Sequence, residues 1–95
     1  MNMTNIVPAN GVTKDENILN GEPVLENTRT PVRAIIEMRR LFYTPAEIVA
    51  RLPHLNLEQV NTAIEYYGEH RAEIDFYIES NRVPHYLIES LMKNQ

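Results

Sequence analysis

The sequence contains no cysteine, which excludes disulfide bonds and metal sites built on thiolates. Its three glycines form no phosphate-binding loop. The two serines, Ser80 and Ser90, lie outside any nucleophile motif. The three histidines stand 16 and 15 residues apart along the chain, a spacing that matches no zinc-binding pattern. We therefore expect neither an enzyme nor a protein with a bound cofactor.

Long apolar runs are also missing. No segment approaches the roughly 20 apolar residues that cross a bilayer, and residues 1–12 carry no lysine or arginine, unlike a signal peptide. We therefore expect a soluble, cytoplasmic protein that makes no membrane contact. A chain of 95 residues can form one domain with a modest core, and we expect a homodimer to supplement that core.

Positive charge is scarce overall, since the formal net charge is −4. Proteins that bind nucleic acids are usually basic. The charge is unevenly distributed, however. Residues 29–51 contain five arginines and two glutamates, for a net charge of +3, whereas residues 1–28 carry −3 and residues 52–95 carry −4. A basic middle segment therefore lies between two acidic ones.

The first part of the chain is predicted to hold an arm and a short β element. Residues 1–16 are polar and lack periodicity, which is typical of a flexible arm. In residues 17–26, two short apolar pieces flank Asn20-Gly21, a pair that favours the positive φ angles of a type I′ hairpin turn. Pro23 has no backbone N–H and restricts the second strand to a sheet edge.

Three helices with clear start signals follow. Thr30-Pro31 offers a hydroxyl cap and then a proline at the first helical position. Residues 44–47 (TPAE) form a capping box, and Asn56 with Gln59 forms another. Gly68 is predicted to follow the last turn of the third helix. The apolar stripe of that helix is Leu57, Val60, Ile64 and Tyr67.

The expected fold class is mainly α, a small helical bundle that contains a helix-turn-helix and carries a short N-terminal β element. The second and third helices are joined by a turn of four residues, 53–56, which suits a helix-turn-helix. A fourth helix over about residues 69–80 completes the domain, which we expect to span residues 17–81. Residues 82–95 are predicted to form a C-terminal tail with a short helix over residues 84–93.

Five sequence blocks, taken together in this order, resemble the bacterial family called domain of unknown function 433. The blocks are GEPVL (21–25), NTRTPV (27–32), TPAEI (44–48), LPHL (52–55) and VNTAIEY (60–66). The resemblance implies a homeodomain-like helical bundle with a short N-terminal β element. Members of this family are often found as a presumed antitoxin beside a toxin with a PIN-like nuclease fold, so the resemblance also implies such a partner.

Two positions depart from the family pattern. Asn27 stands where the family usually has glycine, and asparagine tolerates left-handed backbone conformations better than most residues. We therefore expect the turn at this position to survive. Leu41, Phe42 and Tyr43 replace a usual glycine just before the Thr44 cap. We expect them to place additional apolar surface at the end of the first helix, where a partner could bind.

Seven side chains are candidates for DNA contact. In a helix-turn-helix the first helix crosses the phosphate backbone and the second enters the major groove, where polar side chains read base edges. The candidates are Arg29, Arg39, Arg40, Arg51, Gln59, Asn61 and Thr62. Alternatively, Arg29 fixes the β element to the helices through backbone carbonyls, Glu22 or Glu26. The other arginines are then ordinary surface charge, as the i, i+4 pair Arg33 and Glu37 suggests. The second motif helix contains no lysine or arginine, which disfavours DNA binding.

Acidic and aromatic side chains in the C-terminal third are candidates for protein contact, because aromatic residues often anchor interfaces. The candidates are Tyr66, Glu69, Glu73, Phe76, Glu79 and Tyr86. The alternatives are a solvated acidic face, local packing of the three aromatics and, as a minor possibility, a metal site among the carboxylates of residues 65–79. Tyr67 and Tyr77 belong to apolar stripes and are expected in the core.

These observations favour an antitoxin-like binding protein that sequesters a PIN-like nuclease toxin and represses its own operon by binding operator DNA. The first alternative is a stand-alone helix-turn-helix regulator that binds DNA. The second alternative is a structural dimer or adaptor with neither role.

Overall fold

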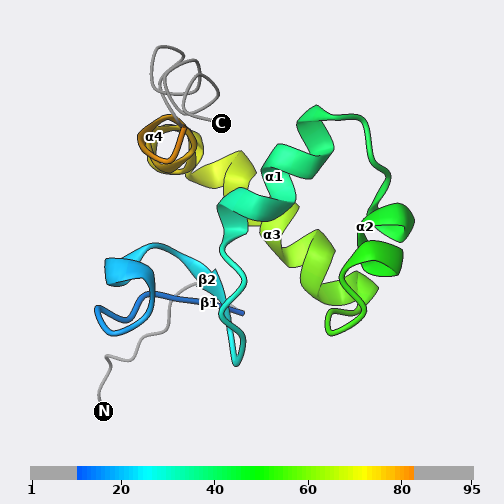
Figure 1. Cartoon of the computed structure of the whole chain (residues 1–95), viewed down its shortest axis with the longest axis horizontal. Coiled ribbons are helices and arrows are strands. Elements are labelled where there is room, and N and C mark those ends of the chain that lie inside the picture. Colours follow the sequence, from blue (N-terminus) through cyan, green and yellow to red (C-terminus); the bar gives the residue numbers. More distant parts are fainter. Residues whose placement is uncertain (1–10, 83–95) are drawn as a thin grey trace, which may run out of the picture.

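The computed structural model describes residues 11–82 and contains four α-helices, a small sheet and a 3₁₀ turn (Figure 1). The predicted fold class, mainly α with a helix-turn-helix and a short β element near the N-terminus, is confirmed. In chain order the elements are β1 (Val12–Thr13), η2 (Leu19–Gly21), β2 (Val24–Leu25), α1 (Val32–Arg40), α2 (Pro45–Arg51), α3 (Leu57–Glu69) and α4 (Arg71–Ser80).

The β element differs from the predicted hairpin. β2 pairs with β1 in antiparallel register, Val12 opposite Leu25, and not with the residues just before Asn20-Gly21. Asn20-Gly21 does supply positive φ angles, but Leu19 shares them (φ 51°, 56° and 88° for residues 19–21), so the chain forms a 3₁₀ turn in place of a two-residue hairpin turn. The predicted turn type and strand pairing are therefore wrong.

The predicted arm is also too long at its C-terminal end. Val12 is buried in the core, and Gly11 accepts a hydrogen bond from the backbone N–H of Glu26 (2.8 Å). The folded unit therefore begins by residue 11 at the latest. Residues 1–10 lie outside the described residues, as does the predicted helix over residues 84–93.

The start of α1 is set by the sheet and not by a side-chain cap. Thr30 was expected to cap this helix, but Pro31 occupies the N-cap position and no side-chain cap hydrogen bond forms. The backbone of this segment pairs with β2: the N–H of Leu25 donates to the carbonyl of Thr30 (2.9 Å). The Thr30 hydroxyl instead lies 2.7 Å from Nε2 of His54, which ties the β element to the helix-turn-helix turn.

The helix-turn-helix forms as predicted. Both capping boxes are present: Thr44 and Glu47 cap α2, while Asn56 and Gln59 cap α3. Each box satisfies two backbone N–H groups that would otherwise lack partners at a helix start. The turn between the helices covers residues 52–56.

The core is formed where α1 packs against α3 and α4, where α2 packs against α3, and where the β element covers α3. Its fully buried large side chains are Val24, Leu25, Val32, Ile35, Ile48, Val60 and Ile74. In Figure 1 the β element lies at one side of the molecule and α2 at the other, with α3 running between them.

The buried face of α3 is rotated from the predicted stripe. Leu57 is half exposed, whereas Ala63 and Tyr66 are buried. The predicted stripe included only large apolar side chains. It therefore omitted the small Ala63, which lies at the centre of the face that is actually buried. Gly68 also lies inside α3, which continues to Glu69, so the prediction that Gly68 ends this helix is wrong.

Candidate functional site

Three of the four arginines that were predicted to contact DNA make contacts within the fold. Arg39 donates a hydrogen bond to the carbonyl of Tyr43 (2.8 Å). Arg40 donates to a carboxylate oxygen of Asp75 in α4 (2.8 Å). The guanidinium of Arg51 lies over the ring of Tyr43, 4.5 Å from its centroid. Each arginine therefore has an intramolecular role, although all three keep exposed surface.

Two of the three polar candidates on α3 are also used within the fold. The side-chain oxygen of Gln59 accepts from the backbone N–H of Asn56 in the capping box (2.8 Å). Thr62 packs under the β element: a Cβ added to Gly11 would lie 3.1 Å from its Cγ2. Asn61 is exposed, and so are the neighbouring carboxylates of Glu58 and Glu65. The outer face of α3 therefore carries negative charge, which repels phosphate.

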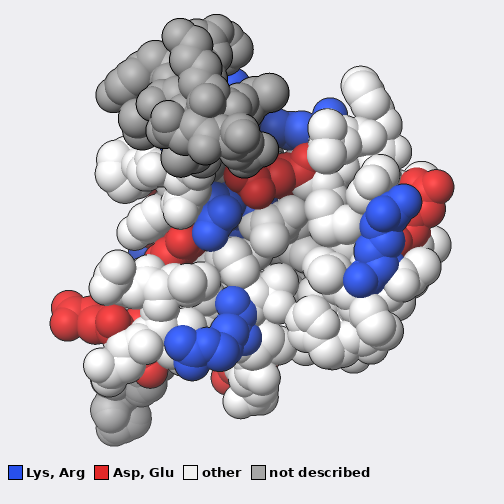
Figure 2. Space-filling view, in the orientation of Figure 1, with Lys and Arg blue, Asp and Glu red and all other residues white. Residues whose placement is uncertain are grey.

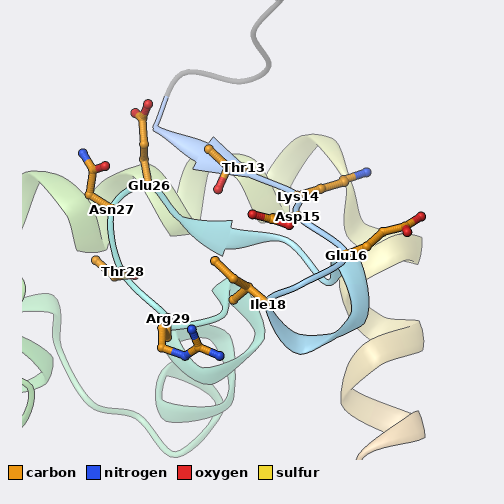
Figure 3. Close-up of a pocket in the computed structure, with 9 residues that line it drawn as sticks. All are labelled: Thr13, Lys14, Asp15, Glu16, Ile18, Glu26, Asn27, Thr28 and Arg29. Carbon is orange, nitrogen blue, oxygen red and sulfur yellow. The ribbon is translucent and has the colours of Figure 1, made fainter.

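Arg29, the remaining DNA candidate, lines an open hollow of about 720 Å³ beside the β element (Figure 3). The charged residues around this hollow do not converge on one point. Figure 3 shows Lys14, Glu16 and Glu26 pointing away from one another, while Arg29 lies on the far side near Ile18. Catalysis requires a base, a nucleophile or a metal ligand set within contact distance of one reacting atom, and this hollow offers none.

An ion pair between Arg33 and Glu22 links α1 to the segment between η2 and β2. Sequence analysis considered Arg29 for this role, with Glu22 or Glu26 as its partner. Nε of Arg33 lies 2.7 Å from Glu22, whose side chain is buried, while Arg33 itself is only 17% exposed. The predicted pair Arg33–Glu37 is present at 3.8 Å. Arg33 was therefore misjudged as purely solvated, because Glu22 lies eleven residues away along the chain.

Two of the predicted partner-binding residues form an internal cluster between α3, α4 and β1. Tyr66 is buried, and its hydroxyl donates to Glu73 (2.7 Å). Glu73 also pairs with Lys14 (2.6 Å) and lies 3.8 Å from His70, whose ring stacks on Tyr66. This cluster joins the end of the β element to α4, so neither Tyr66 nor Glu73 presents a free docking surface.

The cluster shifts the ionisation of its acidic groups. Burial by itself would raise the pKa of Glu73, but hydrogen bonds from Lys14 and Tyr66, together with the positive charge of Lys14, outweigh burial and lower that pKa. Burial, and then the hydrogen bond to Glu73, raises the pKa of the Tyr66 hydroxyl well above its ordinary value. At neutral pH Glu73 is therefore an anion that accepts hydrogen bonds from neutral Tyr66.

The other partner candidates remain on the surface. Glu69, Phe76 and Glu79 are exposed, with Glu79 paired to Arg82 (2.9 Å). Tyr86 lies outside the described residues. An exposed ion pair of this kind contributes little to stability and is readily exchanged for another partner.

Phe76 lines a hollow of about 290 Å³ between η2 and α4, which we call the η2–α4 groove. Phe76 is 62% exposed and Leu19, on η2, is 41% exposed. The lining residues are Leu19, Asn20, Glu22, Arg33, Phe76, Tyr77, Ser80 and Asn81. Sequence analysis identified Phe76 but not Leu19, because nothing near residue 19 in the sequence indicates that it faces a helix some 57 residues later.

The surface charge of the described residues is mixed. In Figure 2 basic and acidic side chains alternate over the visible face, and no continuous basic area is seen on that face. Within residues 11–82 no three histidine or carboxylate side chains are grouped so that they could hold a metal ion. No helix in the same range is long and apolar enough to span a membrane.

The fold and these surfaces define a small helical domain built on a helix-turn-helix with a β element at its N-terminal side. The chain belongs to the family described as protein of unknown function (DUF433), whose model matches residues 12–67, more than half of the chain. The fold is also similar to the crystal structure of a DUF433 member from Anabaena variabilis ATCC 29413. That similarity has a TM-score of 0.68 and 27% sequence identity, and it covers 74% of this chain and 69% of the other. No curated protein matches the sequence.

Proposed function

We propose that this chain is an antitoxin-like, protein-binding module of the cytoplasm, and that its partner is a nuclease toxin with a PIN-like fold. The nature of the partner rests on the family, whose members are often found beside such toxins. The single structural observation that supports protein binding is the η2–α4 groove. Two large apolar side chains, Leu19 and Phe76, are exposed there on different elements.

The groove has the features of a protein contact. Exposed apolar side chains that lie close together commonly mark interfaces, and aromatic residues contribute much of the binding free energy there. The Glu22–Arg33 ion pair (2.7 Å) contributes two of the polar side chains that line the groove.

Protein binding is favoured over DNA binding by the charge of the chain, which is −4 overall. Among the arginines that were predicted to contact phosphate, Arg40 is already paired with Asp75 (2.8 Å). The α3 helix, which would enter a major groove, exposes glutamates and has no basic residue. Repression of an operon by this chain would therefore need positive charge from a partner or from a second copy.

The proposal is tested by co-purifying the tagged chain from its native host and titrating the purified partner into the wild type and two variants. Phe76→Ala should weaken binding by at least tenfold, because it removes an exposed aromatic anchor without opening the core. Leu57→Ala is the matched control: it removes an apolar side chain of similar exposure from the far end of α3. Equal affinity of both variants and the wild type would contradict the groove as the binding site.

A stand-alone DNA-binding regulator is the second candidate, favoured by the helix-turn-helix itself. Phosphate contacts weaken steeply with salt. If the chain bound specific DNA, its affinity should fall by orders of magnitude between 50 and 200 mM salt, as expected for several phosphate contacts. An affinity that does not depend on salt would exclude this role.

A further inference from the structure

The loop between α1 and α2 contains an unfavourable backbone conformation in an unexpected residue. The helix ends in a Schellman motif: the N–H of Tyr43 donates to the carbonyl of Met38 (3.1 Å), and the N–H of Phe42 donates to that of Arg39 (2.8 Å). Phe42 occupies the position that this motif usually gives to glycine, and its φ is 71°. A bulky aromatic residue is rare in this conformation.

Within residues 11–82, no neighbouring element buries the Phe42 side chain. Phe42 is 88% exposed, and the preceding Leu41 is 67% exposed. The two side chains therefore form an apolar knob at the end of α1, which we call the Phe42 knob. In Figure 1 this loop lies on the opposite side of the molecule from η2, so the knob is separate from the η2–α4 groove.

Two arginines lie near the base of the knob, where both contact Tyr43, the residue that follows Phe42. The Tyr43 ring packs against the core, and both flanking arginines are held on Tyr43: Arg39 through its carbonyl (2.8 Å) and Arg51 over its ring (4.5 Å). Among residues 11–82, neither arginine pairs with a carboxylate within 4.0 Å. The carboxylate of Glu47 is engaged in the α2 cap, where it accepts from the N–H of Thr44 (2.8 Å).

We propose that the Phe42 knob is a second docking surface, which inserts into an apolar pocket bordered by carboxylates on a protein partner. Charge complementarity selects this partner, because the arginines beside the knob can pair with carboxylates through two parallel hydrogen bonds. A second copy of the chain would bring the same arginines together across a twofold axis and repel itself. Nucleic acid is disfavoured by the chain's net charge of −4.

The test selects ligands by chemistry without assuming an identity. A displayed library of random 12-residue peptides is selected on the immobilised full chain and, in parallel, on Phe42→Gly, a variant that suits the Schellman position and so keeps the fold. Peptides bound by the wild type alone should be enriched in Asp or Glu together with Leu or Phe. In solution, Phe42→Gly should weaken the best of them by tenfold or more.

Two further variants separate this proposal from its alternatives. Arg51→Gln should weaken the peptide and reduce the dependence of binding on salt. Phe76→Ala should leave peptide affinity unchanged, since it alters only the η2–α4 groove, so this proposal and the proposed function can fail independently. The proposal is overturned if no peptide depends on Phe42, if the dependent peptides are basic, or if Phe42 mediates binding of single-stranded oligonucleotides or self-association.

Discussion

Replacement of Phe42 by glycine is expected to make the free protein more stable, although it removes the larger side chain. The left-handed conformation costs a non-glycine residue roughly 1–2 kcal/mol. Glycine offsets part of this gain, since it loses about 0.5–1 kcal/mol more backbone entropy on folding. Phe42 is 88% exposed, so its removal forfeits little burial. The net expectation is a gain of about 0.5–1 kcal/mol.

Thermal unfolding followed by circular dichroism measures this gain. For a domain of this size 1 kcal/mol corresponds to roughly 4–8 °C in Tm, so Phe42→Gly should raise Tm by several degrees. Phe42→Ala is the control, because alanine keeps the Cβ that makes the conformation unfavourable and should change the stability by less than about 0.5 kcal/mol. If Phe42→Gly and Phe42→Ala both lowered Tm markedly, Phe42 would be packing in the fold and the reasoning would be refuted.

Three further predictions concern glycines, the buried ion pair and acid. Gly68→Ala should raise the free energy of unfolding in urea by about 0.5–1 kcal/mol, because Gly68 lies inside α3 with open space around it. Gly21→Ala should lower that free energy, because Gly21 has φ 88°. The opposite order of stability for the two variants would contradict the bounds of α3. Glu22→Ala should lower the free energy of unfolding by about 2–4 kcal/mol in the same assay, since it leaves the largely buried Arg33 without its ion-pair partner. A decrease below about 0.5 kcal/mol would show that the fold does not depend on this pair. The lowered pKa of Glu73 contributes stability that is complete above the ordinary pKa of 4.5 and is lost as the pH falls through the lowered pKa. Glu73→Gln should therefore make the free energy of unfolding fall less steeply in acid. An unchanged dependence on acid pH would argue against the Glu73 cluster.

The parts of the fold that depend on neighbouring residues could be predicted from the sequence. Both capping boxes join residues three apart, so the starts of α2 and α3 follow from local chemistry. Asn27 adopts φ 63°, as its place in a family glycine position implied. Exposed apolar surface was expected at Leu41, Phe42 and Tyr43. It is present at Leu41 and Phe42, whereas Tyr43 packs against the core.

Predictions failed where distant residues decide the structure. The strands are two residues long, too short to give an alternating pattern, and β1 joins β2 from across η2. Thr30 has the local features of a cap, but pairing with β2 and the contact with His54 override them.

Contacts between residues that are distant in the sequence also limited the prediction of the site. Arg40 pairs with Asp75, which lies 35 residues away, so an arginine that a local reading assigns to DNA serves the fold. Tyr66 was named as a candidate for partner binding, with local packing as the alternative, and the structure shows it buried on the same face of α3 as Ala63. The η2–α4 groove depends on how η2 and α4 come together, which neither segment indicates alone.

The central claim, that the chain works by binding a nuclease, is tested most directly by the activity of the partner. The nuclease that co-purifies from the native host is assayed for RNA cleavage while the purified chain is titrated in. The account predicts stoichiometric inhibition that Phe76→Ala weakens by at least tenfold and Leu57→Ala leaves intact. Recovery of specific DNA without a protein partner, or a nuclease whose activity the chain leaves unchanged, would contradict it.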